Sequence, residues 1–213
     1  AQNVLLPAGV GLRAIFWISM ASLSGLIVWN VLPFFSFQDD LPFLLEKGRV
    51  AETPLWRASL YVHVAGGVVC LLSALPQFSR RLLRRAPRVH RTLGWTYVAS
   101  VLGLVVPAGL VLSIDAKGGF AGRLGFVVLG VALLYTTLRG LQHVLRRDFR
   151  GHASWMLRSY AMASSAVSFR VFYVGFHLLG FGETYVLSVW LSLVVNLVCA
   201  ELLIGLRRKG VPA

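Results

Sequence analysis

The sequence has little charge for its length, and most of that charge has one sign. Only 14% of its 213 residues are charged, against about a quarter in an ordinary soluble domain. Acidic residues number only 8, whereas hydrophobic residues make up 57% of the chain. This composition excludes a disordered polymer and argues against an ordinary soluble enzyme.

Cysteines and the usual catalytic motifs are also scarce. The two cysteines, Cys70 and Cys199, cannot form a disulfide framework, and both lie in apolar stretches. The sequence has no Cys-x-x-Cys-His motif for covalent haem attachment. It also has no nucleophile elbow, metalloprotease helix or carboxylate pair. Hydrolytic chemistry therefore has no support, and whether the protein is an enzyme stays open.

Long apolar stretches are what the sequence has in abundance. A helix needs about 20 predominantly apolar residues to cross the hydrocarbon core of a bilayer. Six stretches have roughly this length: 12–33, 57–79, 92–114, 121–145, 154–179 and 184–206. The first lacks the charged start and cleavage pattern of a secretory signal, so we expect it to be retained. We predict an all-α fold, a polytopic bundle of six transmembrane helices forming one domain over residues 1–213.

Basic residues gather at alternate ends of these stretches. Of the 21 Lys and Arg residues, fifteen fall on one side of the predicted spans, five on the other, and Arg170 lies within a span. By the positive-inside rule this bias places both termini in the cytoplasm. A nucleic-acid-binding protein would gather its arginines on one soluble face among exposed aromatic residues. We therefore expect the lipid bilayer as partner and no nucleic acid.

The connection 34–56 is the longest on the side with few basic residues. Asp39 or Asp40 can cap a helix, and Pro42 suits the first helical turn. We predict a short helix in the membrane interface, which would form a lid over the outer mouth of the bundle. An ordered loop with exposed acids is the alternative.

The five histidines fall at two depths. At 1.5 Å per residue, His63 and His177 share the outer leaflet, whereas His90, His143 and His152 lie at the cytoplasmic boundary. Haem b in a helical bundle needs two imidazoles at one depth, small residues where the porphyrin passes, and basic groups for its propionates.

This layering predicts two candidate haem sites. His63 and His177 would form the outer pair, with Gly66 and Gly67 leaving space for the porphyrin. His90 would pair with His143 or His152 at the inner boundary, near Arg91, Arg146 or Arg150. The alternative is that the histidines are solvated or bonded within the protein.

Arg170 is the most costly residue in the predicted spans, because a guanidinium stays charged near the centre of the bilayer. No carboxylate lies at its level, which leaves Asn196 or the backbone carbonyls around Pro107 as structural partners. The alternative partner is an anionic group such as a propionate, a lipid phosphate or a substrate carboxylate. Arg158 and Glu201 lie at similar depths on neighbouring spans, so we expect a structural ion pair between them.

Several motifs stand in an order that resembles a known family. They are His63-Val-Ala-Gly-Gly, Gln77-Phe78, the arginine run, His90-Arg-Thr-Leu-Gly-Trp-Thr-Tyr97, and His152-Ala-Ser-Trp-Met-Leu-Arg-Ser-Tyr-Ala161 followed by Arg170. Over roughly 34–180 the chain resembles the predicted bacterial membrane proteins called domain of unknown function 2306. The resemblance implies a multi-pass protein of the bacterial inner membrane, with a shared site or scaffold formed by His63, His90, Arg91, Gly94, His152, Arg158 and Arg170.

A looser likeness is to two-haem transmembrane b-type cytochromes. Those proteins pair histidine ligands between alternate helices, whereas the depth-matched outer pair here lies on the second and fifth spans. Our leading hypothesis is an inner-membrane protein that binds haem b or a quinone and transfers electrons. The alternative is a non-enzymatic transporter, or an accessory subunit of a larger membrane complex, that binds an anionic ligand or lipid. A homodimer is a further assembly that we consider.

Overall fold

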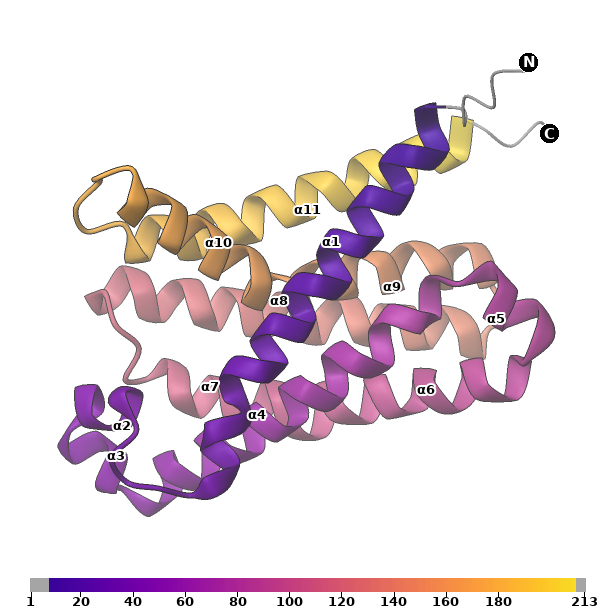
Figure 1. Ribbon diagram of the computed structural model, residues 1–213. Helices are drawn as coiled ribbons and strands as arrows, with labels where there is room; N and C mark the ends of the chain where they lie inside the picture. The colour runs from indigo at the N-terminus through magenta and orange to yellow at the C-terminus, as the bar shows by residue number, and fades with distance from the viewer. Residues whose placement is uncertain (1–7, 210–213) are drawn as a thin grey trace.

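The computed structural model describes residues 8–209, with side chains at 18–19, 21–79 and 81–205. Within this part of the chain every regular element is helical and none is a strand, so the predicted all-α class is confirmed. The longer helices run roughly parallel or antiparallel to one axis, and α1 crosses them obliquely (Figure 1).

The first half of the chain contains two long helical segments joined by short ones. Helix α1 (Ala8–Val31) continues into the 3₁₀ turn η1 (Leu32–Ser36), α2 (Pro42–Lys47) and α3 (Arg49–Glu52). Helix α4 (Pro54–Ala74) ends in a second 3₁₀ turn, η2 (Leu75–Phe78). The short helix α5 (Arg80–Arg85) then leads into the next long segment.

The second half contains the remaining long helices. Helix α6 (Pro87–Ser100) passes through the π-helical turn η3 (Val101–Val105) into α7 (Val106–Ser113). It is followed by α8 (Gly119–Leu145), α9 (Phe149–Ala163), α10 (Ser165–Leu178) and α11 (Tyr185–Lys209). Helix α9 packs on α8 and α11, whereas α10 packs mainly on α11. The main core includes Tyr97, Val101, Leu133, Leu157 and Met162.

Among the described residues, four helical segments are long and apolar enough to cross a membrane, judged by length and composition. They are Pro54–Phe78, Pro87–Ser113, Gly119–Leu145 and Tyr185–Gly205, and they correspond to four of the predicted spans. The predicted span 154–179 is divided between α9 and α10 at Ser164, and 12–33 lies in α1, where many side chains are outside the described residues. The count of six spans and the cytoplasmic termini stay predictions.

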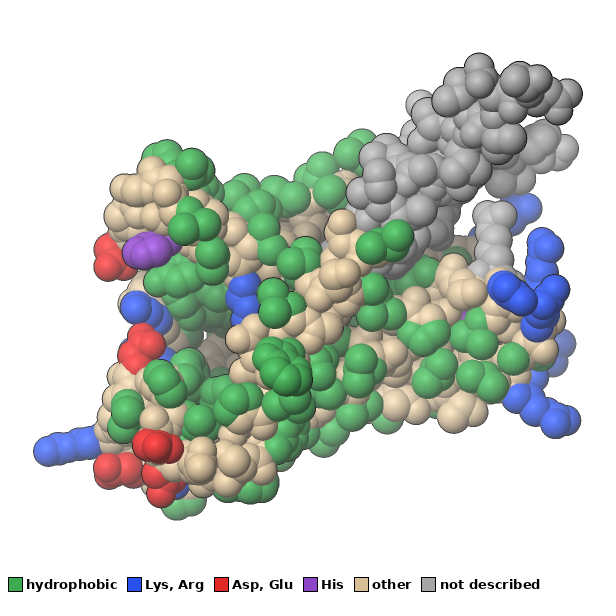
Figure 2. Space-filling model, viewed as in Figure 1, with side chains coloured by type: hydrophobic (Ala, Val, Ile, Leu, Met, Phe, Trp, Pro, Cys, Tyr) green, Lys and Arg blue, Asp and Glu red, His purple; other side chains and the backbone are tan. Residues whose placement is uncertain are grey.

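The two ends of the molecule differ in charge (Figure 2). We call the end with α5 and the connection between α8 and α9 the basic end. Helix α1 begins there and α11 ends there (Figure 1). The opposite end, which we call the acidic end, contains α2, α3 and the connections 114–118 and 179–184. Six of the eight acidic residues belong to it: Asp39, Asp40, Glu46, Glu52, Asp115 and Glu183.

The segment 34–56 contains the short helices α2 and α3. Pro42 is the first residue of α2, as predicted, but Leu41 is the N-cap and no side chain caps the helix. Capping by Asp39 or Asp40 was therefore a wrong expectation, and Asp39 instead forms an ion pair with Arg57 of α4. Lys47 donates to the Asp115 carbonyl over 2.7 Å. Contacts to both α4 and the connection 114–118 thus hold this segment over the acidic end.

Gly66 allows α4 to approach η3 closely. A Cβ atom at this position would lie 2.7 Å from Leu104 Cβ and 3.2 Å from Val105 Cγ2. The Gly66 carbonyl also accepts a hydrogen bond from the Ser100 hydroxyl over 2.6 Å. The neighbouring Gly67 has open space at the same position. Gly66 therefore serves packing between helices, and Gly67 does not.

These adjacent glycines provide a matched test of the packing. Replacing Gly66 with Ala is expected to lower the free energy of unfolding by about 1–3 kcal/mol, because the added methyl group meets packed atoms. Replacing Gly67 with Ala adds the same atom into open space and should change stability little. Denaturant unfolding in detergent measures both variants. Equal effects of the two substitutions would contradict the close approach of α4 and η3.

Candidate functional site

His63 of α4 is held by a backbone carbonyl in the middle of the bundle. Its Nδ1 lies 2.9 Å from the carbonyl oxygen of Val105. A carbonyl oxygen can only accept, so Nδ1 carries the proton and donates. In the neutral ring this leaves the lone pair on Nε2, which is the nitrogen free to accept a proton or to ligate.

The acceptor of His63 lies in an irregular part of the backbone. In η3 the amide of Val106 bonds to the carbonyl of Val101, five residues back, and Pro107 follows with no amide to donate. Gly109, a turn further on, makes room for the imidazole, because a Cβ there would lie 3.0 Å from His63 Cε1. Carbonyls near Pro107 were considered as partners of Arg170, but the one at Val105 bonds to His63.

Arg170 of α10 has few partners for its charge. One guanidinium nitrogen donates to the Ala166 carbonyl of the same helix over 2.7 Å. Among the described residues no other acceptor bonds to it, although a guanidinium has five N–H donors. The side chain is exposed, and its charge acts on His63 of α4 and on Tyr185 of α11.

An aromatic cluster extends over α8, α10 and α11, and it includes Phe169, the neighbour of Arg170 in sequence. The ring centroids of Phe126, Phe169, Tyr173 and Tyr185 lie 5.2 to 6.2 Å from one another in five pairs. The amino group of Lys117 lies 5.9 Å from the Tyr185 centroid and 3.2 Å from Glu46. Figure 2 shows a hollow at this end between α10 and the α2–α3 segment, with basic and acidic side chains along its rim. Sequence reasoning missed this cluster.

His177, assigned to the outer leaflet, does not join His63, and Asn196 does not join Arg170. His177 is exposed near the end of α10, and no hydrogen bond or ion pair links it to His63 in the described residues. Asn196, considered as a partner of Arg170, instead donates to the Ala161 carbonyl and to the hydroxyls of Ser165 and Ser168. Asn196 thereby bridges the break between α9 and α10.

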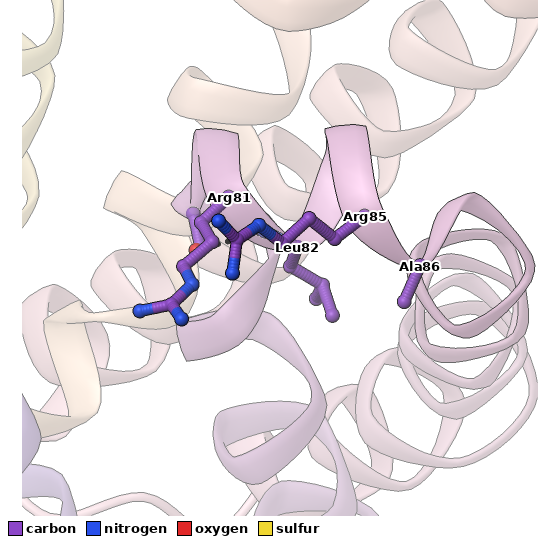
Figure 3. Close-up of a pocket in the computed structure, with 5 residues that line it drawn as sticks. Arg81, Leu82, Arg85 and Ala86 are labelled. Carbon is purple, nitrogen blue, oxygen red and sulfur yellow. Dashed lines mark hydrogen bonds between the residues drawn. The ribbon is translucent and has the colours of Figure 1, made fainter.

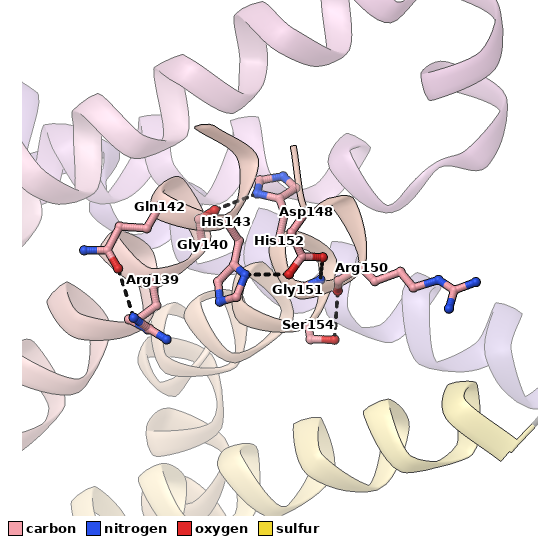
Figure 4. A network of polar contacts seen from close by, with 9 residues as sticks. All are labelled: Arg139, Gly140, Gln142, His143, Asp148, Arg150, Gly151, His152 and Ser154. Carbon is pink, nitrogen blue, oxygen red and sulfur yellow. Dashed lines mark hydrogen bonds and ion pairs between the residues drawn. The ribbon is translucent and has the colours of Figure 1, made fainter. Parts of the chain in front are cut away.

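At the basic end, His143 and His152 both have a bonded Nδ1 (Figure 4). His152 donates to the Gly140 carbonyl over 2.9 Å. His143 Nδ1 lies 2.8 Å from Asp148 Oδ2, and the other carboxylate oxygen of Asp148 caps α9 by accepting from the Gly151 amide. His143 is therefore bonded to Asp148 in the connection between α8 and α9. His152 is bonded through Nδ1 to the backbone of α8.

His90 is the third histidine at this end. Its Nδ1 is buried, and no atom of the described residues bonds to it. His152 is close enough that a charge on its ring would be felt at His90. Of the two partners considered for His90, the structure relates His152 to it by charge and ties His143 to Asp148. Arg91, the next residue after His90, is exposed.

Arg158 and Glu201 form a two-point ion pair between α9 and α11. The Nε–Oε1 distance is 2.5 Å and the second nitrogen lies 2.8 Å from Oε2. The guanidinium also lies 4.6 Å from the Trp155 centroid. This arginine therefore has both an anionic and an aromatic partner within the chain, unlike Arg170.

The site residues thus form two groups, one per half of the bundle. The half nearer the acidic end contains His63, Arg170 and the aromatic cluster. At the basic end, His90 and His152 lie near each other. No three His, Cys, Asp or Glu side chains in the described part of the chain come together as a group able to hold a metal ion.

The fold and these groups define a helical membrane protein. A family model described as predicted membrane protein (DUF2306) matches residues 60–204. The chain therefore belongs to this family, which confirms the resemblance drawn from its motifs. The likeness to two-haem cytochromes is not shown. Neither the search of curated proteins nor the search of solved structures gave a match.

The Asp148 carboxylate offers a test of the arrangement at the basic end. The hydrogen bond from the Gly151 amide, and then that from His143, lower the pKa of Asp148 below its ordinary value of 3.8. Because the pKa of Asp148 is lower in the folded protein than in the unfolded chain, the ionised carboxylate stabilises the folded state at a pH above 3.8. This stabilisation is lost as the pH falls through the pKa of the folded state. We expect acidification from pH 6 to pH 3 to lower the melting temperature of the wild type more than that of Asp148→Asn.

The asparagine retains an oxygen that can cap α9, so the variant isolates the charge. Melting curves in a detergent that does not titrate over this range supply the measurement. Identical pH profiles for the two proteins would show that these bonds do not stabilise the carboxylate.

Proposed function

We propose that this protein is an electron-transfer protein of the bacterial inner membrane that binds haem b through His90 and His152. The observation that carries the proposal is the state of the two imidazoles. His152 has its Nδ1 bonded to a carbonyl, which is how most metal-ligating histidines are oriented, and its Nε2 is then available to ligate. His90 has a buried Nδ1 without a partner, and a bound group is one way to satisfy such an atom.

The residues around this pair suit a haem. Arg91 lies next to His90 in sequence, and Arg146 and Arg150 lie in and beside the connection that precedes His152. Arginines at the boundary of the membrane can neutralise propionates, while the apolar core on the other side shields the iron from water. The haem supplies a one-electron redox centre when it is bound. The chain's own residues orient it and set the polarity around it.

The other half of the bundle suits a quinone. Arg170 can donate to a quinone oxygen, and His63 Nε2 can accept from a quinol hydroxyl. The aromatic cluster of Phe126, Phe169, Tyr173 and Tyr185 offers an apolar wall for the ring. On this proposal His63 Nε2 would accept one of the two quinol protons and Arg170 would hold a ring oxygen, while the second proton would leave to water and the two electrons would leave one at a time to the redox centre at the basic end.

The haem assignment predicts a visible spectrum. Detergent-purified protein is expected to show a Soret band that shifts on reduction with dithionite. Replacing His152 with Ala should remove most of this absorbance per protein, because one axial ligand is lost. His177→Ala is the matched control, since this exposed histidine has no partner among the described residues, and it should keep the band.

A well-folded wild type without a Soret band, after expression with sufficient haem, would contradict the haem assignment. Equal loss of absorbance in His152→Ala and His177→Ala would contradict the choice of ligands. Size-exclusion chromatography and circular dichroism show whether each variant is folded.

A second candidate function is suggested by Arg170. This cation has donors that the described residues do not use, which favours an anionic ligand as its partner. The protein would then be a transporter of an anionic solute or lipid, or an accessory subunit of a larger membrane complex, as a monomer or homodimer. The site would require no redox chemistry.

Ligand-induced stabilisation distinguishes the two candidates. A short-chain quinone is expected to raise the melting temperature of the wild type, and both Arg170→Gln and His63→Ala should lose about tenfold or more in apparent affinity, as a charged and a neutral hydrogen bond are removed. Arg158→Gln is the matched arginine control, because its charge is paired within the chain. Stabilisation by a medium-chain carboxylate, lost in Arg170→Gln but kept in His63→Ala, would favour the anion function and count against the quinone.

A further inference from the structure

A hollow at the basic end belongs to neither of these sites. It has a volume of about 370 Å³ and is lined by Ser79, Arg81, Leu82, Arg85 and Ala86 (Figure 3). All five residues belong to α5 or lie directly beside it. Helix α5 connects two candidate membrane spans, Pro54–Phe78 and Pro87–Ser113. The hollow is therefore at the level where these spans leave the hydrocarbon core.

The local sequence sets the direction of the two arginines. The Ser79 hydroxyl caps α5 by accepting from the Leu82 amide over 3.2 Å, and Pro87 begins the next helix. In this short capped helix, Arg81 and Arg85 are four residues apart and therefore lie on the same helix face. Figure 3 shows both side chains extending to the same side of α5. Leu82 adds an apolar surface between them.

Within the described part of the chain, no ion pair supplies a counter-charge to these arginines. The acidic residues at the basic end are Asp148 and Glu201, and both are already bonded, to His143 and Arg158 respectively. The remaining acids belong to the acidic end. None of the ion pairs among the described residues includes Arg81 or Arg85. Two guanidinium groups thus border one hollow without an anion from the protein.

A phosphate group is the anion that fits this chemistry. Guanidinium groups bind phosphate oxygens through paired hydrogen bonds, which two arginines one turn apart can provide together. At a membrane boundary, phosphate is present at high density as the headgroup of anionic phospholipids, and basic pockets at the ends of spans are where such headgroups bind. Leu82 and the exposed Leu83 can contact the glycerol and the upper acyl chain.

We propose that this hollow binds the headgroup phosphate of an anionic phospholipid from the leaflet at the basic end. Arg81 and Arg85 hold the phosphate, and Leu82 contacts the glycerol backbone. The bound lipid supplies one negative charge between Arg81 and Arg85 and fixes the turn between the two spans. This assignment is independent of haem or quinone binding.

The test measures lipid binding to the full-length protein by native mass spectrometry from detergent micelles. Phosphatidylglycerol and phosphatidylcholine are titrated separately. The wild type is expected to bind the anionic lipid about tenfold more tightly or better, in line with the attraction of two basic side chains. The double variant Arg81→Gln/Arg85→Gln should lose most of this preference. The matched double variant Arg84→Gln/Arg88→Gln removes the same charge outside the hollow and should keep it.

Three results would overturn the proposal. One is equal affinity of the wild type for the two lipids, and another is an equal loss of preference in the two double variants, which would indicate unspecific attraction. The third is competition by millimolar inorganic phosphate that fully displaces the lipid, which would make the hollow a site for free phosphate. If the Arg81/Arg85 double variant does not fold, the single variants Arg85→Gln and Arg84→Gln are compared instead. Arg85→Gln should then lose part of the preference for the anionic lipid, and Arg84→Gln should keep it.

Discussion

A buried hydroxyl network fixes the three helices on which the basic-end site depends. The Tyr97 hydroxyl lies 2.7 Å from the Ser159 hydroxyl, which lies 2.7 Å from that of Thr137. These residues belong to α6, α9 and α8, and all three are almost fully buried. Since lipid offers no hydrogen-bond partner, each buried hydroxyl needs one within the bundle, and this network couples the rotation of the three helices about their axes. That rotation sets where His90 of α6 stands relative to His152 of α9.

Depth in the membrane could be predicted from the sequence, whereas rotation about the helix axes could not. Counting 1.5 Å per residue placed Arg158 and Glu201 at similar levels, and they form an ion pair. The same count placed Asn196 near Arg170, but Asn196 bonds across the break between α9 and α10. Two residues at one depth meet only if both helices turn them toward each other, and packing at other positions decides that.

Irregular backbone was the other part that the sequence pattern did not reveal in full. The apolar lengths identified the helices, because hydrophobicity alone determines that property. Pro107 indicated an interruption of the helix. It did not reveal that the π-helical turn before it presents the Val105 carbonyl to His63. The aromatic cluster was missed for the same reason, since Tyr173 and Tyr185 come together only after the chain reverses between α10 and α11.

The break at Ser164 connects this irregularity to Arg170. The Ser164 hydroxyl bonds to the Tyr160 carbonyl, and Asn196 occupies the Ala161 carbonyl, so side chains satisfy the backbone where the helix is interrupted. Beyond the break α10 follows α11, whereas α9 before it packs mainly on α8. Arg170 is thereby placed outside the bundle core. No carboxylate of the described residues pairs with it there. The interruption at Ser164 is therefore what carries Arg170 away from α8 and toward α11.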